Sequence, residues 1–188
     1  MKPLACLTLL LLTSCSLRRG LDTDVCAGRA AFSASLASLG DGVAIFRHDE
    51  LVGSAGTPCL LATDRAACDA AFARLKPVKP RHMREHGPGP LAIIVTRKDT
   101  VQRLDAKSSW AELSGLPPAT RAQVWIEFKR GLGVLCGGPN VSEGPDGVRV
   151  LVSSHDGCFG GSDQLLLVSP DGAIETLREK SYPQTCVG

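Results

Sequence analysis

The side chains best spaced to perform chemistry lie in the stretch His82-Met83-Arg84-Glu85-His86. Two histidines four residues apart share one face of a helix, where both imidazoles can bind the same zinc ion. A glutamate beside them can activate a water molecule bound to that ion. The spacing therefore raises one enzymatic hypothesis, a metal-dependent hydrolase that uses His82, Glu85 and His86.

The residues around this motif favour a solvated basic loop instead. The motif matches the H-x-x-E-H pattern of inverted zinc peptidases, which needs both histidines on one helix and a third ligand from a second helix. Here Pro80 precedes the motif and Gly87-Pro88-Gly89-Pro90 follows it, which leaves little more than one helical turn. We therefore predict no metal site and no cofactor, and keep His82, Glu85 and His86 only as candidates for weak metal binding.

The first fifteen residues have the layout of a secretory signal. Lys2 is a short positive segment, residues 4–12 are apolar, and small residues precede Cys15. An apolar span of roughly nine residues is too short to cross a bilayer as a helix. Leu12-Thr13-Ser14-Cys15 resembles a bacterial lipobox, in which the cysteine thiol is acylated and the preceding peptide is removed. We predict that residues 1–14 are a lipoprotein signal peptide.

Acylation of Cys15 would anchor the mature protein without a membrane-spanning helix. Two or three acyl chains give stable anchoring where one is marginal, because each buried methylene contributes roughly 0.8 kcal/mol. Residues 15–23 are then the lipidated cysteine and a short tether. Ser16 follows the acylated position, and a residue other than Asp there suits outer-membrane delivery. We expect a lipid-anchored protein of the bacterial cell envelope, at its outer membrane.

The length and charge of the mature chain set limits on its organisation and partners. Removal of residues 1–14 leaves 174 of the 188 residues, which suits one compact domain with its own core. Residues 24–188 are therefore predicted to form a single domain. Loss of Lys2 leaves 20 of the 21 Lys and Arg residues against 19 Asp and Glu, with both signs mixed along the chain. A nucleic-acid-binding domain carries a clustered basic face, so we expect no nucleic-acid partner.

Six cysteines remain once Cys6 has left with the signal and Cys15 is acylated. They are Cys26, Cys59, Cys68, Cys136, Cys158 and Cys186. An oxidising compartment favours pairing them as three disulfides, although six cysteines allow fifteen connectivities. The spacings include no C-x-x-C pair, which argues against redox catalysis and a structural zinc site.

One of these cysteines has neighbours that could activate a thiol. His155-Asp156 lies next to Cys158, and a histidine can act as base to a cysteine nucleophile. A nucleophilic cysteine must stay reduced, however, and an exported cysteine with five possible partners is better explained by a disulfide. We therefore predict no catalytic residue in the chain.

Two kinds of pattern predict the secondary structure. Apolar spacing with start and stop signals indicates three helices, which run from Asp22 or Thr23 to about Leu39, from Thr63 or Asp64 to Lys76, and from Pro117 or Pro118 to Arg130. Short apolar segments indicate strands at residues 43–46, 51–52, 91–96, 101–104, 134–136, 148–153, 164–168 and 173–178.

The order of these elements indicates an α+β fold class. We predict a mostly antiparallel sheet with about three packed helices, held by disulfides. The strand at 91–96 is apolar on both faces and should be central in the sheet. Ser169-Pro170-Asp171-Gly172 has the residue types of a hairpin turn, because Pro presets φ early and Gly accepts a positive φ late.

The expected elements suggest how the cysteines pair. Cys59 lies in the loop that leads into the second helix and Cys68 lies in that helix, so a disulfide between them would pin the loop. In the C-terminal meander, the end of strand 148–153, the start of strand 164–168 and the end of strand 173–178 share one edge of the sheet. This edge brings Cys158 near Cys186. Cys26 and Cys136 are left to each other by elimination.

Several segments of the mature chain form a recognisable combination. They are Cys68-Asp69-Ala70-Ala71-Phe72-Ala73-Arg74-Leu75, Arg97-Lys98-Asp99, Leu165-Leu166-Leu167-Val168-Ser169-Pro170-Asp171-Gly172 and Cys186-Val187-Gly188. The combination resembles an uncharacterised group of lipoproteins abundant in myxobacteria. The resemblance implies an envelope location and no known activity. Some members carry a further ferritin-like domain, but this chain lacks paired Glu-x-x-His motifs, so no di-iron site is implied.

These observations lead to two hypotheses of different classes. The first is a non-enzymatic binding or structural module, tethered to the membrane by its N-terminal lipid, that contacts another envelope protein or a surface ligand. The alternative is the metal-dependent hydrolase at His82, Glu85 and His86. We expect that the protein is not an enzyme.

Overall fold

The computed structural model describes residues 34–78, 90–132, 141–155 and 160–183, and the structural statements below concern these residues. Its elements are η2 (Leu36–Leu39), β1 (Gly42–Arg47), β2 (Glu50–Gly56), α2 (Arg65–Leu75), β3 (Leu91–Arg97), β4 (Thr100–Leu104), η3 (Trp110–Leu113), α3 (Pro118–Arg130), β5 (Val141–Gly144), β6 (Gly147–His155), β7 (Gly161–Val168) and β8 (Ile174–Tyr182). The α+β fold class predicted from the sequence is confirmed.

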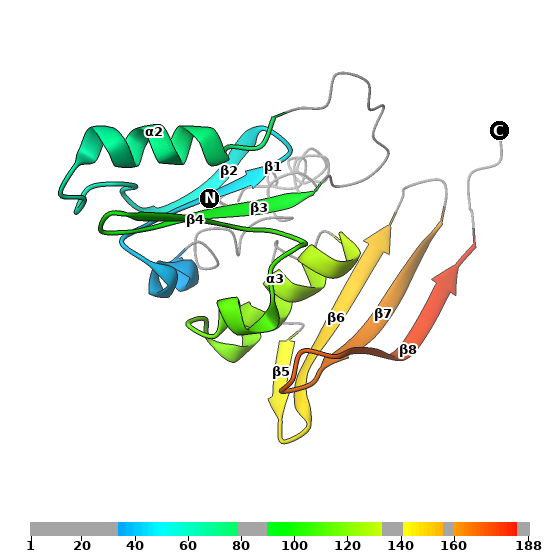
Figure 1. Cartoon of the computed structure of the whole chain (residues 1–188). Helices are drawn as coiled ribbons and strands as arrows, with labels where there is room; N and C mark the ends of the chain where they lie inside the picture. The colour runs from blue at the N-terminus through cyan, green and yellow to red at the C-terminus, as the bar shows by residue number, and fades with distance from the viewer. Residues whose placement is uncertain (1–33, 79–89, 133–140, 156–159, 184–188) are drawn as a thin grey trace, which may run out of the picture.

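The strands form two separate four-stranded sheets, not the one sheet that the sequence suggested. The first sheet has the order β2-β1-β3-β4 and the second has the order β5-β6-β7-β8. Every described strand pair is antiparallel. Helix α3 lies between β4 and β5 in the chain and also between the two sheets in space (Figure 1). The sheets are separate because this helix occupies the space through which they would have joined.

The described residues contain two α-helices, so the expectation of about three is not met there. The first expected helix, up to Leu39, is described only from residue 34, and its described end is the 3₁₀-helix η2. In a 3₁₀-helix, side chains three residues apart lie above one another. Leu36 and Leu39 have this spacing, and both are fully buried. The tighter helix thus places both leucines in the core.

The elements stack in four layers: α2, the first sheet, α3 and the second sheet (Figure 1). Phe72 and Leu75 of α2 pack on one face of the first sheet, against Phe46 and Ile94. The opposite face belongs to a larger hydrophobic cluster that also includes α3 and one face of the second sheet. This larger cluster is the main core of the described structure.

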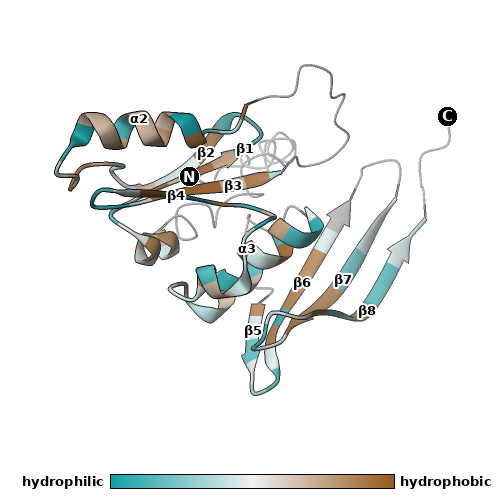
Figure 2. Ribbon diagram, in the orientation of Figure 1, coloured by the Kyte–Doolittle hydropathy of each residue, from teal (hydrophilic) through white to brown (hydrophobic). Residues whose placement is uncertain are grey.

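Strand β3 is central in the first sheet, as its sequence predicted. Its residues are buried from Leu91 to Thr96. Because side chains alternate between faces, Ile93 and Val95 join the main core while Ile94 lies under α2. Figure 2 shows the strand hydrophobic along most of its length. An apolar strand of this kind requires a covering layer on each side, and α2 and α3 supply them.

Helix α3 has the bounds that its end signals predicted. It begins at Pro118, in the position where a missing N–H costs nothing. It ends before Gly131, whose φ of 62° is a left-handed conformation that glycine accepts readily. The helix is buried from Ala122 to Phe128, polar side chains included. A helix is buried on all sides when layers pack on two of its faces.

Within the described residues, one face of the second sheet is covered. Val148, Val150 and Leu166 point into the main core, whereas Leu151 on the other face is exposed. Strand β8 is exposed from residue 175 to residue 181, and Figure 2 shows hydrophilic residues over this part. None of the helices within the described ranges is long and apolar enough to span a membrane.

Two tryptophans, one in η3 and one in α3, donate hydrogen bonds to the β7–β8 turn of the second sheet. Trp110 donates from Nε1 to the carbonyl of Pro170 over 2.9 Å, and Trp125 donates from Nε1 to the carbonyl of Gly172 over 2.7 Å. Their ring centroids lie 5.5 Å apart. Gly172 has φ of 90°, and a Cβ there would lie 2.6 Å from the Trp110 ring. The predicted hairpin turn is therefore both present and held against the tryptophans.

Candidate functional site

A pocket of about 490 Å³ opens at one end of the first sheet. It lies where the β1–β2 turn, the start of β3, the end of β4 and the end of α3 meet. Its lining residues are His48, Pro77, Val78, Pro90, Leu91, Ala92, Arg103, Asp105, Ala106, Lys107, Glu127, Phe128, Lys129 and Gly131. Pockets with apolar walls and a few polar groups are the usual form of ligand sites, so this one is the candidate site.

Several buried residues that line the pocket are apolar. Leu91 and Ala92 at the start of β3 are buried, and so is Phe128 near the end of α3. Val78, by contrast, is 86 % exposed where it reaches the rim. The pocket thus offers an apolar surface to a ligand and an exposed apolar residue at its opening.

A buried ion pair stands beside this apolar surface. Arg47 Nη1 lies 2.8 Å from Glu127 Oε1, and the Glu127 side chain is fully buried while that of Arg47 is 21 % exposed. Removing a carboxylate from water is costly unless a cation and hydrogen bonds compensate. The pair joins the end of β1 to α3, so it fixes the helix against the sheet at the pocket.

Arg103 is one of the pocket cations, and it is bound to neighbouring groups. Its Nε lies 3.0 Å from Asp105 Oδ2, and its Nη1 donates to the carbonyl of Leu75 over 3.2 Å. These bonds tie the end of β4 to the end of α2. Arg103 therefore shapes the pocket wall.

Lys129 is held in a similar way. Its ammonium donates to the carbonyls of Ala106 and Ser108, over 2.7 and 3.2 Å, and lies 4.3 Å from the centroid of the Trp125 ring. A cation over an indole face is attracted by the ring quadrupole. The lysine thus connects the loop after β4 to α3, while Lys107 in the same loop is exposed at the rim.

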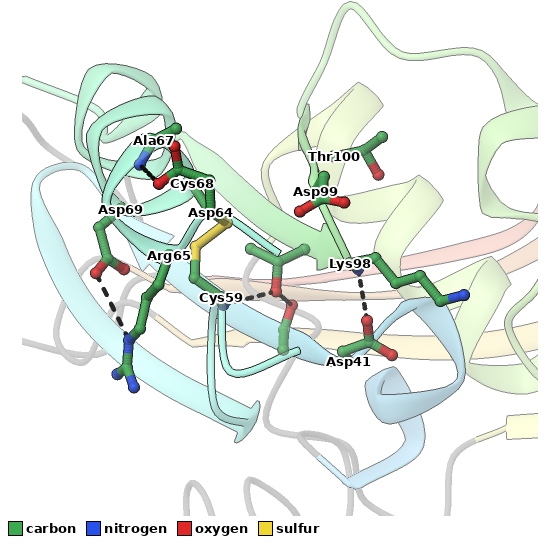
Figure 3. The surroundings of a disulfide bond; sticks show 12 residues. Asp41, Cys59, Asp64, Arg65, Ala67, Cys68, Asp69, Lys98, Asp99 and Thr100 are labelled. Carbon is green, nitrogen blue, oxygen red and sulfur yellow. Dashed lines mark hydrogen bonds and ion pairs between the residues drawn. A yellow bond between two sulfur atoms is a disulfide. The ribbon is translucent and has the colours of Figure 1, made fainter. Parts of the chain in front are cut away.

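The disulfide candidates have different outcomes. Cys59 and Cys68 form a disulfide, with Cα atoms 5.7 Å apart (Figure 3), the pair suggested first by the sequence. The other four candidates, Cys26, Cys136, Cys158 and Cys186, lie outside the described residues, and their pairing stays a prediction. The lipidation candidate Cys15 lies outside them as well.

A hydrogen-bonded carboxylate supports the loop that carries this disulfide. The backbone N–H of Thr63 donates to Asp99 Oδ1 over 2.6 Å, and the Thr63 hydroxyl donates to Oδ2 over 3.0 Å. Hydrogen bonds to a carboxylate favour its charged form. The backbone bond from Thr63, followed by its hydroxyl bond, lowers the pKa of Asp99 below 3.8.

The candidate metal ligands His82, Glu85 and His86 also lie outside the described residues. Two described residues close to that segment in the chain, Val78 and Pro90, line the pocket. In the part of the chain that the structure describes, no group of three or more His, Cys, Asp or Glu side chains is placed to hold a metal ion.

The sequence did not single out the buried carboxylate. Glu127 stands in the run Val124-Trp125-Ile126-Glu127-Phe128, where it is the only charged residue. A single charge among apolar residues in a helix suggests a buried position with a partner, which was the available signal. The identity of the partner depends on the approach of β1, from 80 positions earlier in the chain.

Comparison with protein families, with curated proteins and with solved structures finds no match to this chain. Its function is therefore argued from its own residues and geometry. The described geometry is suited to binding, since the pocket has an apolar interior and its ion-paired and hydrogen-bonded charges hold its walls together.

Proposed function

We propose that the protein is a lipoprotein of the bacterial cell envelope, anchored at the outer membrane through an acylated Cys15. Its folded part acts as a non-enzymatic binding or structural module that contacts another envelope protein or a surface ligand. The lipobox-like stretch Leu12-Thr13-Ser14-Cys15 supports the anchor. The pocket at the end of the first sheet supports the binding role.

Charged groups at the pocket are engaged in ion pairs, and this supports a binding role. Glu127 is paired with Arg47, and Arg103 is paired with Asp105. Groups engaged in this way keep the pocket walls in place. The accessible interior is left to apolar contact, so we expect a ligand that places an apolar group against Leu91, Ala92 and Phe128.

The anchor is tested by the intact mass of protein extracted from its native membranes. A chain that begins at Cys15 and carries a lipid-sized addition supports the proposal. A Cys15→Ala variant should lose the addition and its retention by membranes. Unlipidated full-length protein in the membrane fraction would contradict it.

The pocket is tested with an environment-sensitive fluorescent amphiphile such as anilinonaphthalene sulfonate, titrated against the full chain. Ala106 is exposed at the pocket rim, and Ala106→Trp should obstruct it and weaken binding on the order of tenfold, or about 1.4 kcal/mol. The matched control is Ala111→Trp, at an exposed position of η3 that does not line the pocket. Equal binding by both variants would exclude the pocket as the site.

The second candidate function, a metal-dependent hydrolase, depends on the spacing of His82, Glu85 and His86. It is tested by the zinc content of protein purified without a chelator or a polyhistidine tag. Stoichiometric zinc that disappears in His82→Ala and His86→Ala variants would favour it. Substoichiometric zinc in the wild type would exclude it.

A further inference from the structure

The loop between β2 and α2 presents two neighbouring leucines to solvent. Leu60 is 57 % exposed and Leu61 is 61 % exposed. Single exposed apolar residues are ordinary, but adjacent ones form a patch that can mark an interaction site. The loop from Thr57 to Thr63 contains no charged residue. We call this uncharged segment the leucine tip.

The leucine tip is fixed from within. Cys59 is joined to α2 by the disulfide to Cys68, and its N–H donates to Thr96 Oγ1 over 3.3 Å. Cys59 has φ of 59°, in the left-handed region. Two further backbone bonds, Leu60 N–H to Thr57 O and Ala62 N–H to Cys59 O, each 3.3 Å long, complete the turn. These bonds hold the leucines in their outward position.

The end of the leucine tip is also fastened to its surroundings. Thr63 donates to Asp99 in the β3–β4 turn through its N–H and its hydroxyl. Asp64 caps α2 by accepting the N–H of Ala67 over 2.9 Å (Figure 3). The carboxylates of Asp99 and Asp64, which lie next to the tip, thus already accept hydrogen bonds from the protein.

The leucine tip and the pocket lie at opposite ends of the first sheet. A Cβ on Gly42, the first residue of β1, would lie 2.4 Å from the nitrogen of Pro58 in the tip. The other end of β1, at Arg47 and the following turn, reaches the pocket residue His48. The chain also enters the sheet at the tip end, because η2 leads directly into Gly42.

We propose that Leu60 and Leu61 insert into the interfacial layer of the bilayer that holds the acylated Cys15, so that the pocket faces away from the membrane. This inference rests on the proposed anchor. A tethered domain meets the bilayer at a high effective concentration, so two leucines suffice for a contact that would be weak in free solution. The predicted tether from Ser16 to Thr23 has eight residues, which span at most about 28 Å when extended, and the chain then enters the first sheet through η2 at the tip end.

A lipid surface fits the leucine tip better than a protein groove does. Its seven residues carry no charge, and moving an uncharged, internally hydrogen-bonded turn into the interface removes no ion from water. Specific protein contacts add polar and charged groups around an apolar centre. The tip has no charged side chain within its own segment.

The test places a tryptophan at the leucine tip of the lipidated full-length chain in phosphatidylcholine vesicles. Leu60→Trp fluorescence is measured with and without brominated acyl chains, which quench indoles inside the bilayer. Leu51→Trp is the matched control, since Leu51 is 55 % exposed on β2 near the pocket end of the sheet. The wild type reports the background from Trp110 and Trp125.

Each outcome bears on the proposal. We expect a blue shift and bromine-dependent loss of fluorescence for Leu60→Trp, beyond the wild type, and none for Leu51→Trp. Vesicle-bound protein with equal signals from both variants would overturn the leucine-tip contact but leave the anchor intact. A tip that serves a protein partner would give that same negative result in pure lipid. Protein that fails to float with the vesicles would overturn the anchor, and the tip contact with it.

Discussion

The two sheets of the molecule have the same number of strands and the same antiparallel pairing, yet they are covered differently. The first sheet has α2 on one face and α3 on the other, whereas in the part of the chain that the structure describes the second sheet has a covering helix, α3, on one face. In the first sheet the uncovered features are its ends, where the leucine tip and the pocket lie. In the second sheet, Leu151 on the face away from α3 and the strand β8 from residue 175 to residue 181 are exposed. The first sheet is therefore buried in its middle and offers contact sites at its ends.

The strand sequences account for this difference. Residues 91–95 in β3 are continuously apolar, as in a strand buried on both faces. In β6, the buried apolar residues at 148, 150 and 152 alternate with Arg149, Leu151 and Ser153, and the polar residues at 149 and 153 are typical of a strand with one solvated face. The exposed edge strand β8 carries several charges, which discourage pairing with other chains.

The largest expected effect on the free energy of unfolding comes from a comparison of the outer faces of the two sheets. Ile94→Ala removes a fully buried side chain beneath α2 and should lower the free energy of unfolding by about 2–5 kcal/mol. Leu165→Ala, on the uncovered face of the second sheet where burial is only partial, should cost about 1 kcal/mol or less. Urea denaturation measures both. Equal losses would mean that a further layer covers the second sheet.

The next effect concerns the disulfide of the first sheet. Replacement of Cys59 and Cys68 together by alanine should lower the unfolding free energy by about 2–3 kcal/mol, because a closed loop of this size restricts the unfolded chain. The paired variant avoids leaving a lone thiol. Unchanged stability would show that the bonds from Thr63 and Cys59 hold the leucine tip without the disulfide.

The second sheet has its own predicted disulfide. Its register places the ends of β6, β7 and β8 side by side, at His155, Gly161 and Tyr182. Cys158 and Cys186 follow these ends closely in the sequence, so their pairing remains our prediction. Non-reducing peptide mapping should recover a peptide that contains both cysteines. A Cys26–Cys158 peptide would contradict it.

A smaller effect tests how the second sheet is fastened to α3. Trp125→Phe removes the hydrogen bond to the Gly172 carbonyl and should cost about 1–2 kcal/mol. Trp110→Phe removes the corresponding bond to Pro170, and its less buried ring should make that loss smaller. Thermal and urea unfolding of both variants give the comparison. Changes below about 0.5 kcal/mol for Trp125→Phe would show that apolar packing alone holds the sheets together.

The smallest expected effect is a pH dependence of the unfolding free energy. In each sheet, one carboxylate in a turn contributes to it. Hydrogen bonds from Thr63 lower the pKa of Asp99 below 3.8, and hydrogen bonds led by the Ser169 hydroxyl lower that of Asp171. A folded pKa below the unfolded one contributes stability above pH 3.8, which is lost as the pH falls through the folded value. Asp99→Asn and Asp171→Asn should each reduce this acid dependence. Nuclear magnetic resonance titration measures both pKa values directly, and values at or above 3.8 would contradict the prediction.

Patterns of neighbouring residues in the sequence predicted the helix ends and the central strand correctly, because interactions between those neighbours determine them. Helix α2 begins after the Asp64 cap and α3 ends before Gly131, and both bounds lie close to the predictions. The central position of β3 also followed from its composition. Each of these depends on neighbouring residues in the chain, so one sequence was enough to find it.

The arrangement of the sheets could not be found in this way. The division into two sheets depends on where α3 packs, which involves residues far apart in the sequence. Trp110 and Trp125 are 15 positions apart in the chain, and only the fold shows that both bind the turn at Pro170 and Gly172. The pocket was missed for the same reason, because its walls come from five segments of the chain that have no common motif.

The position of α3 as a layer shared by both sheets has a consequence for the order of folding. Each sheet is made from one continuous part of the chain, residues 42–104 and 141–182, with α3 between them. A chain that emerges from its N-terminus, as in synthesis or in the export that we propose, would release the first sheet, then its covering helix, and last the second sheet. The first sheet and α3 would present a ready surface when the second sheet arrives. A protein of this design can fold in sequence from its N-terminus, because the first sheet and α3 do not require the C-terminal strands to form.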